Sequence, residues 1–111
     1  MLSSSKRLST NLFKETLEKG LVYNTQFTLL YILNGFRTNR FSVSIPKKVA
    51  KLAVLRNKIR RRIYSIIESL SSRTIPSVHV AVIMKGGSEK MSFKSLREEI
   101  QKAFVKSGIL K

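Results

Sequence analysis

The stretch Phe41–Ile63, FSVSIPKKVAKLAVLRNKIRRRI, joins a short strand pattern to a strongly basic helix pattern. From Arg40 to Ile45 apolar and polar residues alternate, which is typical of a half-buried strand. Pro46 ends this strand, because proline has no backbone N–H to donate to a sheet ladder. A helix is predicted from about Val54 to Leu70. The stretch therefore predicts a strand whose chain continues directly into a basic helix.

The predicted helix is amphipathic. At 100° per residue, one narrow arc holds an apolar seam, with Ile67 at its edge: Leu55, Ile59, Ile63, Ile66 and Leu70. Basic residues and one asparagine lie opposite the seam or flank it: Arg56, Asn57, Lys58, Arg60, Arg61 and Arg62. No acidic residue stands between Glu18 and Glu68 to pair with them. A solvated helix face is the alternative, but unpaired like charges on a helix repel, which favours a bound polyanion.

Composition points to the same class of partner. The chain has 111 residues, a net charge of +16, 42% hydrophobic residues, one His and no Cys. The hydrophobic fraction favours one folded domain, and the high positive charge favours nucleic acid as its partner. One His and no Cys exclude a zinc site or a disulfide framework. The six carboxylates are all Glu and form no cluster by sequence, which disfavours a free-standing two-metal nuclease. No signal or membrane-spanning pattern is visible, so a cytoplasmic protein without a membrane partner is expected.

The remaining segments predict a single α+β sandwich over residues 10–111, after a flexible N-terminus over residues 1–9. A first helix, capped by Thr10 or Asn11, is predicted to run to about Lys19. The strand pattern at 26–33 and the one at 40–45 flank Asn34-Gly35, which predicts an antiparallel hairpin. A strand covered on both faces is predicted at Val78–Met84, and a last helix at Phe93–Lys106.

Two further features offer weaker candidates. Four aromatic residues could stack on unpaired bases: Phe13, Phe27, Tyr31 and Phe41. For Phe27 and Phe41, positions in the core are favoured. His79 lies in an apolar strand, where a structural role is favoured over catalysis.

The expected nucleic acid is RNA rather than DNA. Arginine contacts to phosphate recognise the shape of the nucleic acid, and no pair of helices typical of DNA recognition is visible.

Arg56-Asn57 followed by Arg60-Arg61, together with the preceding Val43-Ser44 and Lys47-Lys48, resembles the signature of the bacterial ribonuclease P protein subunit family. Flanking segments that resemble the family are Lys6-Arg7-Leu8, Val80–Gly86 and Ser92-Phe93 with Leu96-Arg97. The resemblance implies an α-β sandwich with a small mixed sheet and a left-handed βαβ crossover.

The resemblance also implies a function. The protein would bind a catalytic RNA, ribonuclease P RNA, with one protein per RNA. It would also bind the 5′ leader of precursor tRNA and promote Mg²⁺-dependent removal of that leader in tRNA 5′ maturation. The RNA subunit and its Mg²⁺ would perform the hydrolysis. The alternative from the residues alone is a ribosomal or other structured-RNA-binding protein without catalytic involvement.

Site residues follow from the resemblance by position. Arg56, Asn57, Arg60 and Arg61 would contact the catalytic RNA, with three lysines close by: Lys47, Lys48 and Lys51. Arg60 replaces a common lysine. Phe13 matches an aromatic residue of the leader cleft, and Leu17 stands where many members have a second aromatic residue. Leu30, rather than Tyr31, is expected at the position of a cleft tyrosine, and both are kept as cleft candidates.

Overall fold

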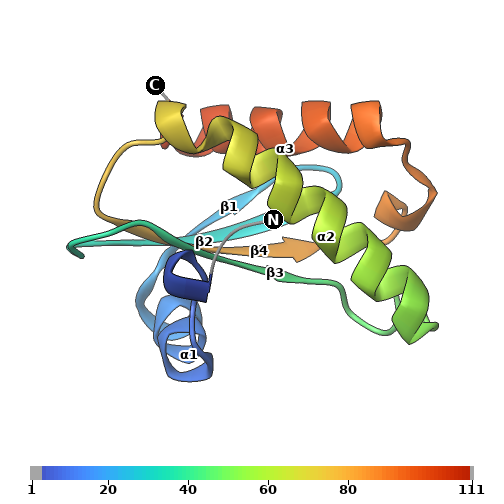
Figure 1. Ribbon diagram of the computed structural model, residues 1–111, viewed down its shortest axis with the longest axis horizontal. Helices are drawn as coiled ribbons and strands as arrows, with labels where there is room; N and C mark the ends of the chain where they lie inside the picture. The colour runs from blue at the N-terminus through green and yellow to red at the C-terminus, as the bar shows by residue number, and fades with distance from the viewer. Residues whose placement is uncertain (1–3, 111) are drawn as a thin grey trace.

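The computed structural model describes residues 4–110. Its sheet is covered by helices α2 and α3 on one face and by α1 on the other (Figure 1). The elements in chain order are α1 Thr10–Lys19, β1 Leu21–Asn24, β2 Thr28–Asn34, β3 Arg40–Ser44, α2 Ala53–Leu70, β4 Val78–Met84 and α3 Phe93–Ser107. Short 3₁₀ turns are Ser4–Lys6, Ser71–Arg73 and Ser88–Lys90. The predicted α+β sandwich is confirmed.

The four strands form one mixed sheet in the order β1-β2-β4-β3. β2 pairs with β1 and β4 in antiparallel fashion, whereas β3 and β4 are parallel and are joined by α2. The predicted hairpin between β2 and β3 is wrong, because β4 lies between them. The physical reason is that β4 is apolar on both sides and therefore takes the interior position, where both faces are covered. The left hand implied for the crossover stays a prediction.

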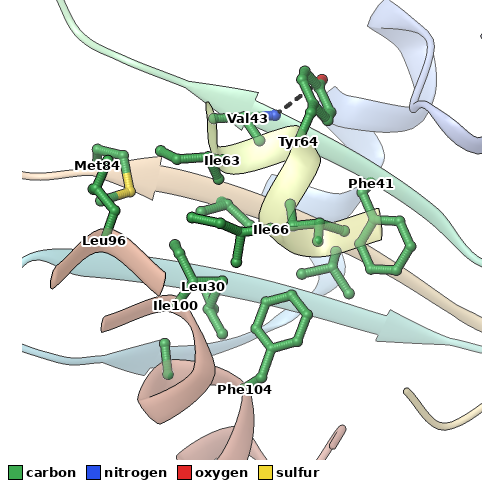
Figure 2. Close-up of a cluster of buried hydrophobic side chains, with 14 of the residues drawn as sticks. Leu30, Phe41, Val43, Ile63, Tyr64, Ile66, Met84, Leu96, Ile100 and Phe104 are labelled. Carbon is green, nitrogen blue, oxygen red and sulfur yellow. Dashed lines mark hydrogen bonds between the residues drawn. The ribbon is translucent and has the colours of Figure 1, made fainter. Parts of the chain in front are cut away.

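The main hydrophobic core lies between the sheet and the pair α2 and α3 (Figure 2). The predicted seam of α2 is confirmed at four positions, with Leu55 half-buried at its edge: Ile59, Ile63, Ile66 and Leu70. α3 contributes three fully buried side chains: Leu96, Ile100 and Phe104. α2 also buries Tyr64 and Ile67, which widen the stripe on either side. The basic residues in the first half of α2 lie outside this stripe and keep contact with solvent.

The first helix begins one or two residues earlier than predicted, depending on which of the two predicted caps is taken. The Ser9 hydroxyl caps it by accepting a hydrogen bond from the Leu12 amide at 3.3 Å, so neither Thr10 nor Asn11 is the cap. At its end, a Cβ on Gly20 would lie 2.5 Å from the Thr16 carbonyl oxygen. Only glycine allows the chain to pass so close and enter β1, a strand that the sequence pattern did not predict.

The outer edge of β3 is covered by two contacts. The Leu8 amide donates to the Phe41 carbonyl at 2.9 Å, and the Val43 amide donates to the Tyr64 hydroxyl of α2 at 3.2 Å. An open strand edge would offer these backbone groups to other chains. Residues 1–3 of the predicted flexible N-terminus lie outside the described residues, and its flexibility stays a prediction.

Candidate nucleic-acid interface

The predicted basic residues lie together on the loop after β3 and on the first half of α2. We call this set the basic face: Lys47, Lys48, Lys51, Arg56, Asn57, Lys58, Arg60, Arg61 and Arg62. The three lysines of the loop are exposed, as are Asn57, Lys58 and Arg61, whereas the other arginines are half-buried. The structure therefore places all nine predicted residues on one loop and the helix turns that follow it, with Lys58 and Arg62 on the flank of the buried seam opposite Arg56 and Arg60.

Arg56 has a structural contact that the sequence pattern did not indicate. Its guanidinium Nη1 donates to the carbonyl oxygens of Ala50 and Lys51, at 2.9 and 2.8 Å. These bonds tie the lysine-bearing loop to the first turn of α2. Since a guanidinium has five N–H donors, Arg56 retains donors for a ligand while it holds the loop in place.

Asn57 orients Arg60. The Arg60 Nη1 donates to the Asn57 Oδ1 at 2.6 Å, across one turn of the helix. Both residues line a hollow of about 380 Å³ together with Val54 and Arg61. The asparagine therefore holds one guanidinium in a fixed direction beside a second, which is an arrangement suited to phosphate groups.

The local electrostatics favour an anion. In the described part of the chain, none of the cations of the basic face forms an ion pair with a carboxylate. The N-cap position of α2, Leu52, offers no side-chain hydrogen bond, and the first turn holds no acidic residue. Free amides and the positive end of the helix dipole therefore add to the positive field of the side chains. A polyanion would relieve this repulsion.

A second hollow, which we call the α1–β3 hollow, lies beside the N-terminus of α1. Its volume is about 250 Å³, and it is lined by Leu8, Ser9, Thr10, Phe13, Ser42, Val43 and Ser44. The Ser42 hydroxyl is buried and has no hydrogen-bond partner among the described residues. Phe13 is half-buried here. The hollow thus presents an aromatic ring, whereas the unpaired hydroxyl lies beneath its surface.

The remaining cleft candidates divide between the two faces of the sheet. Leu30 is 1% exposed within the core under α2 and α3, so its predicted place among the residues of an open cleft is wrong. Side chains alternate along a strand, and this puts the half-buried Tyr31 on the side where α1 packs. Leu17 is half-buried on α1, outside the described lining of the α1–β3 hollow.

The other aromatic candidates are structural. Phe41 is 1% exposed and belongs to the core, as predicted. Phe27 is half-buried, and its ring lies so close to Gly87 that a Cβ there would be 2.8 Å from it. Phe41 is therefore not available for stacking on a base, whereas Phe27 packs against Gly87 and keeps part of its surface exposed.

His79 is buried and stacks on Phe36, with ring centroids 3.5 Å apart. Burial lowers the pKa of His79 below 6.5 and the nearby Arg40 charge lowers it further, whereas Glu15 raises it. The ring is therefore neutral in the folded protein at pH 7. Its Nδ1 has no hydrogen-bond partner among residues 4–110, so packing rather than hydrogen bonding holds it.

Among the described residues, no three His, Cys, Asp or Glu side chains gather into a metal-binding group. No helix there is long and apolar enough to cross a membrane.

Comparison with known proteins identifies the family. A family model described as Ribonuclease P matches residues 2–108. The "Ribonuclease P protein component" of Caldanaerobacter subterraneus subsp. tengcongensis is 28% identical over 106 residues, which cover 95% of this chain and 90% of the relative.

Solved structures share the fold. The Staphylococcus aureus RNase P protein superposes with a TM-score of 0.86 at 22% identity, covering 96% of this chain and 98% of that one. The Thermotoga maritima RNase P protein gives a TM-score of 0.77 at 19% identity, covering 86% and 92%. The sequence match over nearly the whole length and the shared fold agree: the chain belongs to the ribonuclease P protein family.

Proposed function

We propose that this chain is the protein subunit of a ribonuclease P ribonucleoprotein and promotes removal of the 5′ leader from precursor tRNA. The observation that carries the proposal is that the family match spans residues 2–108, and that Arg56, Asn57, Arg60 and Arg61 lie together on the basic face. The basic face would bind the ribonuclease P RNA, one protein per RNA. The complex would act in the cytoplasm.

The basic face suits a folded RNA for a physical reason. Its cations are carried by a helix whose apolar seam is buried, and the Arg60 and Arg56 guanidinium groups are held by hydrogen bonds. Fixed cations can match one arrangement of phosphates, whereas a flexible basic tail would respond to charge density alone. Each phosphate contact releases counterions, so assembly should weaken steeply as salt rises.

The α1–β3 hollow would hold the single-stranded leader. Phe13 offers a ring for stacking on an unpaired base, and Ser42 and Ser44 line the same hollow. In this proposal the protein binds and positions RNA, and the Mg²⁺ that supports hydrolysis is bound mainly by the RNA subunit.

The test is cleavage of precursor tRNA by a cognate ribonuclease P RNA at low Mg²⁺, with and without the protein. We expect the protein to raise the cleavage rate and the affinity for precursor tRNA. No enhancement would contradict the proposal and favour a structured-RNA-binding protein of another assembly. Cleavage by the protein alone would place the chemistry in this chain.

A further inference from the structure

A third hollow, which we call the Arg37 pocket, lies at the end of the sheet where β3 and β4 begin. Its volume is about 610 Å³, and its lining includes the cations Lys6, Arg37 and Arg40. Hydroxyl side chains also line it: Thr38, Ser71, Ser72, Thr74 and Ser77. No carboxylate is found among its described lining residues. The Ser71 and Thr74 hydroxyls donate to the Glu68 and Leu70 carbonyls, so the cations carry the case for an anion. Cations without a counter-charge are the chemistry of an anion site.

The Arg37 pocket is separate from the basic face. The pocket lies at the start of β3, whereas the lysine loop follows the end of that strand. α2 carries the basic face on its first half and ends beside Ser71 at the pocket, and its axis from Arg62 to Ser71 spans about 14 Å at 1.5 Å per residue. The two cationic regions therefore lie at opposite ends of β3.

The loop that carries Arg37 is fixed in place. The Ser77 carbonyl accepts hydrogen bonds from the amides of Gly35 and Phe36, at 3.1 and 3.3 Å. The Asn39 side chain donates to the Ile75 carbonyl at 2.8 Å and accepts from a β4 amide at 3.0 Å. Ser77 adopts a φ of 69°, which is unfavourable for a residue with a side chain. The chain tolerates this strain while it holds the loop over the pocket.

The Arg37 pocket adjoins the α1–β3 hollow through an intermediate hollow of about 360 Å³. The intermediate hollow shares Arg40 with the Arg37 pocket, and Leu8 and Ser9 with the α1–β3 hollow. The number of cationic lining residues rises along this path. The described lining of the α1–β3 hollow has no cation, the intermediate hollow has Arg7 and Arg40, and the Arg37 pocket has three cations. Such a path suits a strand with one phosphate per nucleotide.

We propose that the Arg37 pocket binds a phosphodiester group of single-stranded RNA that continues from the α1–β3 hollow, as a distal subsite for the precursor-tRNA leader. This inference rests on the proposed function. Lys6 and Arg37 are exposed and bind the phosphate, whereas the half-buried Arg40 bridges the two hollows and donates to the Arg7 carbonyl at 3.3 Å. An extended strand reaches the pocket only when the leader is long enough.

The experiment uses the holoenzyme and a nested series of precursor tRNAs whose leaders are shortened one nucleotide at a time. With the unmodified protein we expect a step in affinity at one leader length. Lys6→Gln with Arg37→Gln should remove that step and leave the affinity for shorter leaders unchanged. Beyond the step, the double variant should also reduce the salt dependence of log Kd by about 2, one for each lost phosphate contact.

The matched control is Lys90→Gln with Lys94→Gln, which removes two exposed cations near the start of α3. This control should keep the step. A step that persists in the Lys6 and Arg37 double variant would overturn the inference, while normal cleavage of short leaders would leave the proposed function standing.

A titration of the free protein with inorganic phosphate, followed by NMR, separates the two sources of the same group. Saturable binding at Arg37 without any leader step would identify a site for a small anion and overturn the RNA subsite.

Discussion

The carboxylate of Glu99 on α3 accepts a hydrogen bond of 2.8 Å from the hydroxyl of Thr28 on β2. The same oxygen accepts from the Thr25 hydroxyl at 2.6 Å and from the Phe27 amide at 3.2 Å. Glu99 is 6% exposed. A buried carboxylate is tolerated only when hydrogen bonds replace its water, and here those bonds tie α3 to the turn between β1 and β2.

Glu99→Ala should therefore destabilise the fold. The change leaves up to three donors without their acceptor, and we expect the free energy of unfolding to fall by about 2 kcal/mol or more. Urea unfolding followed by circular dichroism measures it. Glu98→Ala at the exposed neighbouring position is the control and should change stability by less than about 0.5 kcal/mol. Equal effects at the two positions would show that the hydrogen bonds contribute nothing.

Asn57→Ala should weaken RNA binding without changing its dependence on salt. Arg60 keeps its charge but loses the acceptor that orients it, so affinity should fall while the number of phosphate contacts stays the same. Arg61→Ala is the comparison, because it removes one contact and should lower the slope of log Kd against log salt by about 1. A reduced slope in Asn57→Ala would show that orientation alone does not explain its effect.

Arg60→Glu combined with Arg61→Glu should weaken assembly with the ribonuclease P RNA and leave folding intact. Arg61 is exposed and Arg60 is half-buried, so reversal of the charges acts mainly on the bound polyanion. Filter binding at fixed salt measures the affinity, and thermal unfolding checks the fold. Unchanged affinity would remove the basic face from the RNA interface.

Phe13→Ala should reduce the contribution of the leader to substrate affinity. The ring lines the α1–β3 hollow, and loss of one stacked base corresponds to about 1–3 kcal/mol. The measurement compares precursor tRNAs with and without a leader, using the holoenzyme. Phe13→Tyr keeps the ring and should retain the preference for a leader. Loss of folding in Phe13→Ala would show that the ring is needed for packing.

His79 should make the fold less stable as the pH falls. Its pKa is lowered in the folded protein by burial and then by Arg40, so the unfolded chain takes up the proton first. Stability contributed by the neutral ring is complete above the ordinary value of 6.5 and declines as pH falls below it. Unfolding between about pH 7.5 and pH 5.5 should show this decline. His79→Phe should flatten it, and an unchanged profile would assign the decline to other groups.

Local patterns specified much of this protein. The 3.6-residue period of α2 predicted its buried seam, because side chains three and four positions apart share a helix face whatever the rest of the chain does. The absence of acidic residues between Glu18 and Glu68 likewise predicted an unpaired basic surface. Alternation in β2 separated Leu30 from Tyr31 onto opposite faces, although it did not show which face would carry the core.

Contacts between segments that are distant in the sequence determined the strand order, the hollows and the hydrogen-bond partners. β4 separates β2 from β3 because burial on both faces favours the most apolar strand inside the sheet, and this competition cannot be seen within either neighbour. The same order buries Leu30 and leaves Tyr31 on the α1 side. Arg56 bonds the carbonyl of Ala50 in the lysine loop, and Lys6 lines the Arg37 pocket, only because folding brings these groups together. Charge and periodicity are properties of neighbouring residues, whereas hollows and hydrogen-bond partners depend on packing across the whole chain.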